Sequence, residues 1–114
     1  MKVYGIKNCS TVKKALDWLT HHHIQYEFHD FNKSGITEEK LYEWGQKVHW
    51  ELLINKRGTT WKKLDNETQE SVTTPEAAFS LLKEKTSMIK RPVIENGDVL
   101  LLGFNEAEYS EKLI

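Results

Sequence analysis

The first thirty or so residues place the strongest limit on what this chain can fold into. Residues 2–6 predict a strand, because Val3, Tyr4 and Ile6 suit a buried, pleated surface. Residues 24–30 alternate apolar and polar side chains, which predicts a second strand. Between them, the spacing of Val12, Ala15, Leu16 and Leu19 forms one apolar stripe, which predicts a helix that ends near residues 21–23. A strand, a helix and a strand form a βαβ unit, whose strands normally pair in parallel with a right-handed crossover.

Cys9, the only cysteine, follows the first of these strands. Loops at the carboxyl ends of parallel strands are where sites are usually built. Unpaired amides at the start of the helix favour a thiolate, and Lys7, Lys13 and Lys14 add positive charge nearby. The alternative is an inert structural cysteine, since free cysteine is among the most buried residue types. The local residues leave both interpretations open.

Three consecutive histidines, His21, His22 and His23, suggest metal binding at first sight. Neighbouring helix positions point about 100° apart, so their rings cannot converge on one ion. We interpret them as a solvated helix end, where imidazole suits the negative end of the dipole. No metal site is predicted.

The middle of the chain predicts several helical pieces. Thr37, followed by two acidic residues, begins one helix, and residues 50–54 predict a shorter one. A proline at the first helical position predicts another helix from Pro75 to about Lys85. Between them, basic residues and threonines surround Gly58 in a segment that includes Arg57, Thr59 and Thr60. This segment is either an anion-binding loop or a threonine cap for a helix that begins at Trp61, and composition favours neither.

The last third predicts an antiparallel pair and a closing helix. Asn96 and Gly97 separate two apolar runs, which is a strong hairpin signal. Asn105, with Glu108 three residues later, is a capping pattern for the final helix. The order β-α-β, a helical middle and β-β-α predicts an α/β, thioredoxin-like fold with a mixed four-stranded sheet. We expect one domain over residues 1–114, with a helical insertion at about 36–86.

Composition narrows the possible partners and compartment. A formal net charge of -1 with 29% charged residues gives no reason to expect nucleic-acid or membrane binding. A single cysteine cannot form an internal disulfide, and a free thiol suits a reducing compartment. The sequence has no secretory leader and no apolar run long enough to span a bilayer. We therefore expect a cytoplasmic monomer.

Four landmarks together resemble the arsenate reductase-like family, and within it the small bacterial proteins of the YffB type, with the Spx-type regulators as cousins. They run nearly from end to end of the chain and occur in a specific order and spacing. They are residues 4–9 before Lys13, Lys14 and Ala15; residues 57–61 with Lys63 and Leu64; residues 89–92; and residues 101–104.

The resemblance implies that Cys9 is a nucleophile and that Arg91 binds the oxyanion, beside a cis proline at Pro92. The chemistry agrees, because a thiolate needs a lowered pKa and a cation that holds the incoming or leaving charge. An arginine can do so bidentately. The remaining residues expected to bind glutathione or substrate are Lys7, Asn8, Lys13, Arg57, Thr59, Thr60 and Pro92.

The sequence also departs from its resemblance to arsenate reductases. Those enzymes use three arginines, but two of the corresponding places hold Asn55 and Gly103, and only Arg91 is retained. A histidine ahead of the nucleophile is replaced by Gly5. Efficient arsenate reduction is therefore not expected. The Cys-x-x-Cys switch of Spx-type regulators is also absent, because its second position is Val12.

These observations predict a glutathione-dependent thiol oxidoreductase that uses one nucleophilic cysteine and binds no cofactor. Glutathione is the expected co-substrate, because the only cysteine needs an outside thiol to resolve an intermediate. The substrate would be a small oxidised thiol or an oxyanion, and a glutaredoxin is a possible further partner. Two alternatives remain, an Spx-like regulator that binds RNA polymerase and a true arsenate reductase.

Overall fold

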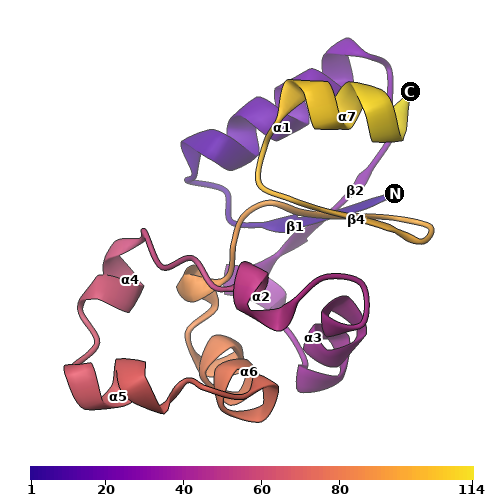
Figure 1. Cartoon of the computed structure of the whole chain (residues 1–114). Coiled ribbons are helices and arrows are strands. Elements are labelled where there is room, and N and C mark those ends of the chain that lie inside the picture. The colour runs from indigo at the N-terminus through magenta and orange to yellow at the C-terminus, as the bar shows by residue number, and fades with distance from the viewer. The chain divides into compact units, whose positions relative to one another are not determined.

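The chain divides into two compact units in the computed structural model, which describes residues 1–114 (Figure 1). The first unit joins Met1–Ser34 to Arg91–Ile114, and the second is Gly35–Lys90. The insertion predicted at about 36–86 lies inside the second unit. None of the helices has the length and apolar character needed to cross a membrane.

The first unit is a four-stranded mixed sheet with the strand order β2-β1-β3-β4. Strand β1 pairs with β2 in parallel and with β3 in antiparallel fashion, and β3 pairs antiparallel with β4. The predicted α/β fold with a mixed, thioredoxin-like sheet is therefore confirmed. The elements of this unit are β1 (Lys2–Gly5), α1 (Ser10–His21), β2 (Glu27–Asp30), α2 (Phe31–Ser34), β3 (Val93–Asn96), β4 (Val99–Leu102) and α7 (Glu106–Leu113).

Helices α1 and α7 lie side by side along this sheet (Figure 1). The apolar stripe of α1 is buried with residues of β1 and β3, and Leu19, Val3 and Ile94 are each fully buried. Trp18 of α1 meets Tyr109 of α7 edge to face, with ring centroids 5.3 Å apart. The stripe that predicted the helix is therefore also the surface that fixes it to the sheet.

The second predicted strand starts later than expected. It begins at Glu27 rather than at residue 24, because the intervening residues bring the chain out of α1. His23 adopts a left-handed conformation with φ 57°, and the Ile24 amide bonds back to the Leu19 carbonyl at 2.9 Å. Residues bonded back to the helix cannot join the β1 ladder. The predicted start was therefore wrong, although the alternating apolar residues of this segment do pack against the core.

The hairpin is confirmed, with its loop one residue further along than the Asn96-Gly97 signal suggested. Asn96 pairs with Val99, so Gly97 and Asp98 form the two-residue loop. Gly97 has φ 60°, which suits the glycine that a type II′ turn takes at its first central position. The predicted cap of the final helix is also confirmed, since the Asn105 side chain accepts the Glu108 amide at 2.9 Å.

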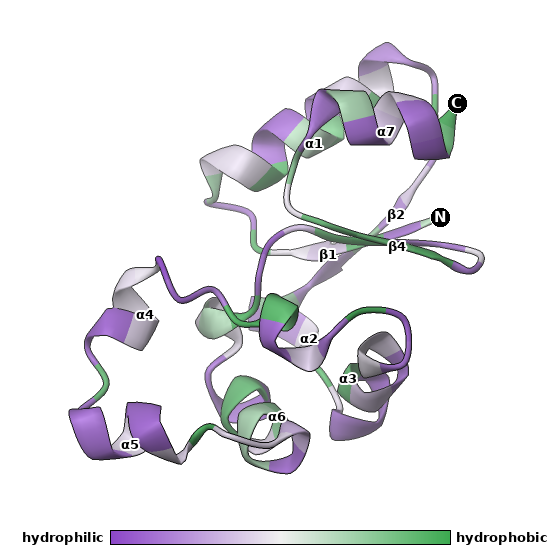
Figure 2. Cartoon of the chain, viewed as in Figure 1, coloured by the Kyte–Doolittle hydropathy of each residue, from purple (hydrophilic) through white to green (hydrophobic).

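The second unit is helical around its own core. Its elements are α3 (Glu38–Gly45), the 3-10 helix η1 (Trp50–Leu53), α4 (Thr59–Lys62), α5 (Asn66–Ser71), α6 (Pro75–Glu84) and the 3-10 helix η2 (Thr86–Met88). The predicted starts of α3 and α6 are confirmed, since Thr37 and Thr74 accept amides as N-caps. Helix α5 was not indicated by the sequence, because it is hydrophilic along its whole length (Figure 2) and has no apolar stripe.

The core of the second unit is apolar and closed by main-chain bonds between η1 and the end of η2. The Asn55 amide donates to the Met88 carbonyl at 2.7 Å, and the Lys90 amide donates to the Leu53 carbonyl at 2.8 Å. These bonds hold the middle of the unit to its carboxyl-terminal end. Its fully buried side chains include Leu41, Trp44, Leu53, Leu82 and Ile89.

Candidate functional site

Cys9 is the N-cap residue of α1. Its backbone is extended, with φ -131° and ψ 121°, and its carbonyl accepts the first helical bond from the Lys13 amide at 3.0 Å. The side chain is half-buried. Its sulfur does not make the short N-cap hydrogen bond that a serine or aspartate makes at this position. The thiol therefore lies at the amide-rich end of the helix and stays accessible to a reagent.

The pKa of the Cys9 thiol lies below its ordinary value. Burial of the thiol raises this pKa. The Val12 amide, a side-chain hydrogen bond from Arg91, the Thr11 amide and the charge of Arg91 lower it, and together they outweigh burial. Amides and a guanidinium both favour the thiolate, because each directs positive charge at the sulfur. The same arrangement holds negative charge on an atom that attacks or leaves at this position.

The lysines contribute less than the sequence predicted. Lys7, Lys13 and Lys14 are exposed and are not among the groups that lower the pKa of the thiol. Water and salt screen exposed charges strongly, whereas a half-buried guanidinium in contact with the sulfur is screened less. Arg91 therefore supplies the side-chain part of the effect.

Arg91 and Pro92 immediately precede β3, and the bond between them is cis, as the resemblance implied. Pro92 is buried, and its carbonyl accepts the Gly103 amide at 2.8 Å. The Gly103 carbonyl in turn accepts the Tyr109 hydroxyl at 2.6 Å. Burial raises the pKa of Tyr109, so this hydroxyl keeps its proton and remains a donor. A chain of hydrogen bonds thus connects α7 to the segment that carries Arg91.

The glycine at position 5 has a structural cause. A Cβ at Gly5 would lie 2.9 Å from Cγ2 of Val12, a contact that real side chains do not make. Val12 is buried and branched, so it has little freedom to move away. The histidine of the related arsenate reductases therefore has no room here.

The glycine at position 103 is explained by its backbone. Gly103 has φ 77°, in the left-handed region that other residues rarely adopt, although the space around it is open. An arginine there would strain the backbone that bonds to Pro92. Both departures are thus part of how this chain folds around its thiol.

The predicted site residues fall into two groups. Cys9, Arg91 and Pro92 belong to the first unit, and Lys7, Asn8 and Lys13 lie around the thiol in its loop and the first turn of α1. Arg57, Thr59 and Thr60 belong to the second unit. Their part in binding stays a prediction.

The interpretation of the threonines as caps of a helix that begins at Trp61 is wrong, whereas an anion-binding role of this segment stays a prediction. Helix α4 begins at Thr59 with Gly58 as its N-cap, so the threonines are the first two helical residues rather than its caps. A Cβ at Gly58 would come within 2.8 Å of the side-chain nitrogen of Asn55, which would have to rotate away. The Thr60 hydroxyl is 2.8 Å from the Ser87 hydroxyl, whereas Arg57 is exposed.

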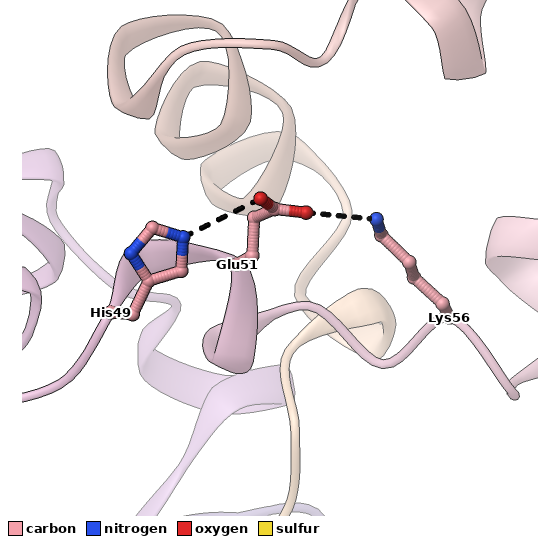
Figure 3. A network of polar contacts seen from close by, with 3 residues as sticks. All are labelled: His49, Glu51 and Lys56. Carbon is pink, nitrogen blue, oxygen red and sulfur yellow. Dashed lines mark hydrogen bonds and ion pairs between the residues drawn. The ribbon is translucent and has the colours of Figure 1, made fainter.

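Two other groups of polar side chains lie apart from the predicted site residues. His22 stacks on Trp18 with ring centroids 4.0 Å apart, and its Nδ1 lies 2.9 Å from the Trp18 carbonyl. In the second unit, Glu51 lies between His49 and Lys56, as Figure 3 shows, at 3.4 Å and 3.3 Å. All three side chains of that network are exposed, so it contributes little to stability. No sequence pattern indicated this network.

The sheet and the site together define a thioredoxin-like protein with a single thiol at the first helix and an arginine before a cis proline. The profile of the ArsC family matches residues 4–112, and the chain belongs to the ArsC family.

Solved structures and curated relatives agree with this assignment. A structure of the protein YffB is 40% identical and covers 99% of this chain and 98% of its own, with a TM-score of 0.93. An arsenate reductase (ArsC) related protein from Brucella melitensis is 42% identical, with coverages of 97% and 92% and a TM-score of 0.77. The global transcriptional regulator Spx of Streptococcus agalactiae is 28% identical over 103 residues, which is 89% of this chain and 74% of that protein. The chain is therefore an ArsC-related protein of the YffB type.

Proposed function

We propose that this protein is a cytoplasmic thiol oxidoreductase that uses glutathione and a single nucleophile, Cys9. The observation that carries the proposal is the pairing of Arg91 and two helix-start amides with the Cys9 sulfur, which lowers the pKa of the thiol. A half-buried cysteine with a lowered pKa is more reactive than a structural one.

The reaction has two exchange steps. The Cys9 thiolate attacks the glutathione sulfur of a mixed disulfide, a new sulfur–sulfur bond forms, and the substrate leaves as a thiolate that takes a proton from water. A second glutathione thiolate then attacks this bond, which releases oxidised glutathione and restores the Cys9 thiolate. The substrate disulfide is thereby reduced, and two glutathione units end as one disulfide. Arg91 and the Val12 amide stabilise the charge on Cys9 as it attacks and as it leaves.

Glutathione binding would use charge around the thiol. Glutathione carries two carboxylates, which suit Arg91 and the exposed Lys7 and Lys13, while Asn8 and the Pro92 backbone lie in the adjacent loops. Arg57, Thr59 and Thr60 would bind its far end. This assignment extends the resemblance to the YffB type.

The test is intact mass after incubation with oxidised glutathione, followed by reduced glutathione. We expect one glutathione adduct on the wild type, its loss on reduction, and no adduct on Cys9→Ser. Arg91→Met should slow the adduct's formation, whereas Lys112→Met, a matched change on α7, should not. An unmodified wild-type protein, or equal rates for Arg91→Met and Lys112→Met, would overturn the proposal.

A second candidate function is regulation through RNA polymerase, and the similarity to Spx supports it. Such a protein would bind the polymerase through a surface and would not need a reactive thiol. Capture of the C-terminal domain of the polymerase α-subunit by the wild type and equally by Cys9→Ser is the expected outcome for a regulator. No binding, together with glutathione exchange, would favour the enzyme.

A further inference from the structure

Strand β2 is at the edge of the sheet and pairs with β1 along one side. The Glu27 amide donates to the Met1 carbonyl at 3.0 Å, so Glu27 directs its main-chain groups toward β1. In a strand, the main-chain N–H and C=O groups of successive residues point alternately toward one neighbouring strand and away from it. The N–H and C=O of Phe28 therefore point away from β1 and form the outer edge of the sheet.

One hollow lies on the α1 side of this edge and has a volume of about 390 Å³. Its lining is mostly apolar and includes Val12, Leu16, Tyr26 and Phe28. We call it the apolar hollow. Lys7, Lys13, Asp17 and Thr20 complete it, so one end of it lies at the first turn of the helix that Cys9 caps.

A second hollow, of about 420 Å³, also runs along β2. Lys2, Lys7 and Lys33 line it together with polar and acidic residues of β2, and we call it the cationic hollow. One of those acids, Asp30, already accepts the Asn32 amide at 2.9 Å. Across the two hollows the lysines outnumber the carboxylates: Lys2, Lys7, Lys13 and Lys33 against Asp17, Glu27 and Asp30.

The geometry points to a docking site for an extended peptide. We propose that the outer edge of β2 binds a segment of a protein substrate as an added strand, with apolar side chains in the apolar hollow and acidic ones in the cationic hollow. A strand presents alternate side chains on opposite faces, and Phe28 lines both hollows, so one peptide can occupy both at once. The excess of lysine selects an acidic segment over a basic one.

The outer edge of β2 lies where a peptide bound to it could reach Cys9. As a site for a protein substrate, this edge depends on the thiol exchange proposed above. Lys7 lines both hollows and lies two residues before Cys9. A peptide along β2 thus ends near the loop that carries the thiol, which would bring an oxidised cysteine at that end to Cys9.

The test uses a labelled peptide of about eight residues that alternates apolar and acidic side chains and has serine in place of cysteine. We expect fluorescence anisotropy to show that this peptide binds the full chain more tightly than a scrambled peptide of equal composition does. In NMR spectra, binding should shift the amide resonance of Phe28. Lys33→Glu should weaken binding roughly three- to tenfold. Lys112→Glu, the same charge change at a residue that lines neither hollow, should not weaken it.

Equal affinity for the two peptides, or equal effects of the two variants, would overturn this inference. A second peptide, with a glutathionylated cysteine where the first has serine, separates this inference from the proposed function. Binding of the serine peptide, with no exchange between the glutathionylated peptide and Cys9, supports docking and counts against the oxidoreductase. Exchange with small mixed disulfides but no preference for the alternating peptide supports the oxidoreductase and rejects docking.

Discussion

Arg91 donates a side-chain hydrogen bond to the sulfur of Cys9, so a residue just before β3 lowers the pKa of the thiol that caps α1. The two residues are distant in the chain, and the antiparallel pairing of β1 with β3 brings their ends together. The guanidinium adds charge and a directed donor to what the helix amides already supply. The site is therefore built by the sheet.

The first prediction concerns the reactivity of the thiol. Alkylation of Cys9 by iodoacetamide, followed against pH, should show a pKa below the value of about 8.5 for an ordinary cysteine. Arg91→Met should move this pKa upward and slow alkylation at neutral pH, because it removes both the hydrogen bond and the charge. Arg57→Met serves as the control for a lost arginine. An unchanged profile in Arg91→Met would show that the amides act alone.

The second prediction follows from linkage. Because the native pKa of Cys9 lies below its unfolded value, ionisation stabilises the native state. This contribution is fully present above the unfolded pKa of about 8.5 and is lost as the pH falls through the native pKa. The difference in the free energy of unfolding between wild type and Cys9→Ser should therefore shift in favour of the wild type as the pH rises. Urea denaturation under reducing conditions at several pH values measures it, and a pH-independent difference would contradict it.

A third prediction concerns the support behind Arg91. Tyr109→Phe removes the 2.6 Å bond to the Gly103 carbonyl and should lower the free energy of unfolding by about 1–2 kcal/mol. Its effect should also reach Cys9 as slower alkylation, since the carbonyl belongs to the segment bonded to Pro92. Tyr26→Phe, at a partly buried tyrosine outside this chain of bonds, should change neither. If Tyr109→Phe alters stability alone, the hydroxyl supports the core but not the site.

The fourth prediction tests the glycines. Gly103→Arg should destabilise the protein by about 1–2 kcal/mol, because a backbone with φ 77° is strained for any residue that has a Cβ. Gly103→Asn should cost less, since asparagine tolerates the left-handed region. Gly5→His should destabilise more than either, because its Cβ meets the buried Val12. Thermal unfolding ranks the three variants, and Gly5→His ranking as the mildest would contradict the steric explanation.

A coupled assay extends the same test to arsenate. Neither wild type nor Gly103→Arg should reduce arsenate efficiently with glutathione and glutaredoxin, because one restored arginine on a strained backbone does not rebuild a three-arginine site. Efficient turnover by the wild type would show that Arg91 and the helix amides are sufficient to bind the oxyanion.

The sequence by itself determined the elements whose signals are local. The apolar stripe of α1, the caps at Thr37, Thr74 and Asn105, and the glycine of the hairpin each depend on neighbours within a few residues. It also identified Cys9 as the residue at the strand-to-helix junction. The start of β2 and the whole of α5 were missed, because a helix exit and a hydrophilic helix carry no apolar period.

The tertiary structure decided which charges act on the thiol. Local charge suggested the lysines and the family resemblance suggested Arg91, and the fold places Arg91 at the sulfur and leaves those lysines in water. The clash that keeps position 5 a glycine joins β1 to α1, and the bonds that tie Gly103 to Pro92 and Tyr109 join the end of β4 to the residue before β3 and to α7. Contacts of this kind depend on strand pairing and helix packing, which no short stretch of sequence contains, so the reactivity of Cys9 is a property of the folded sheet.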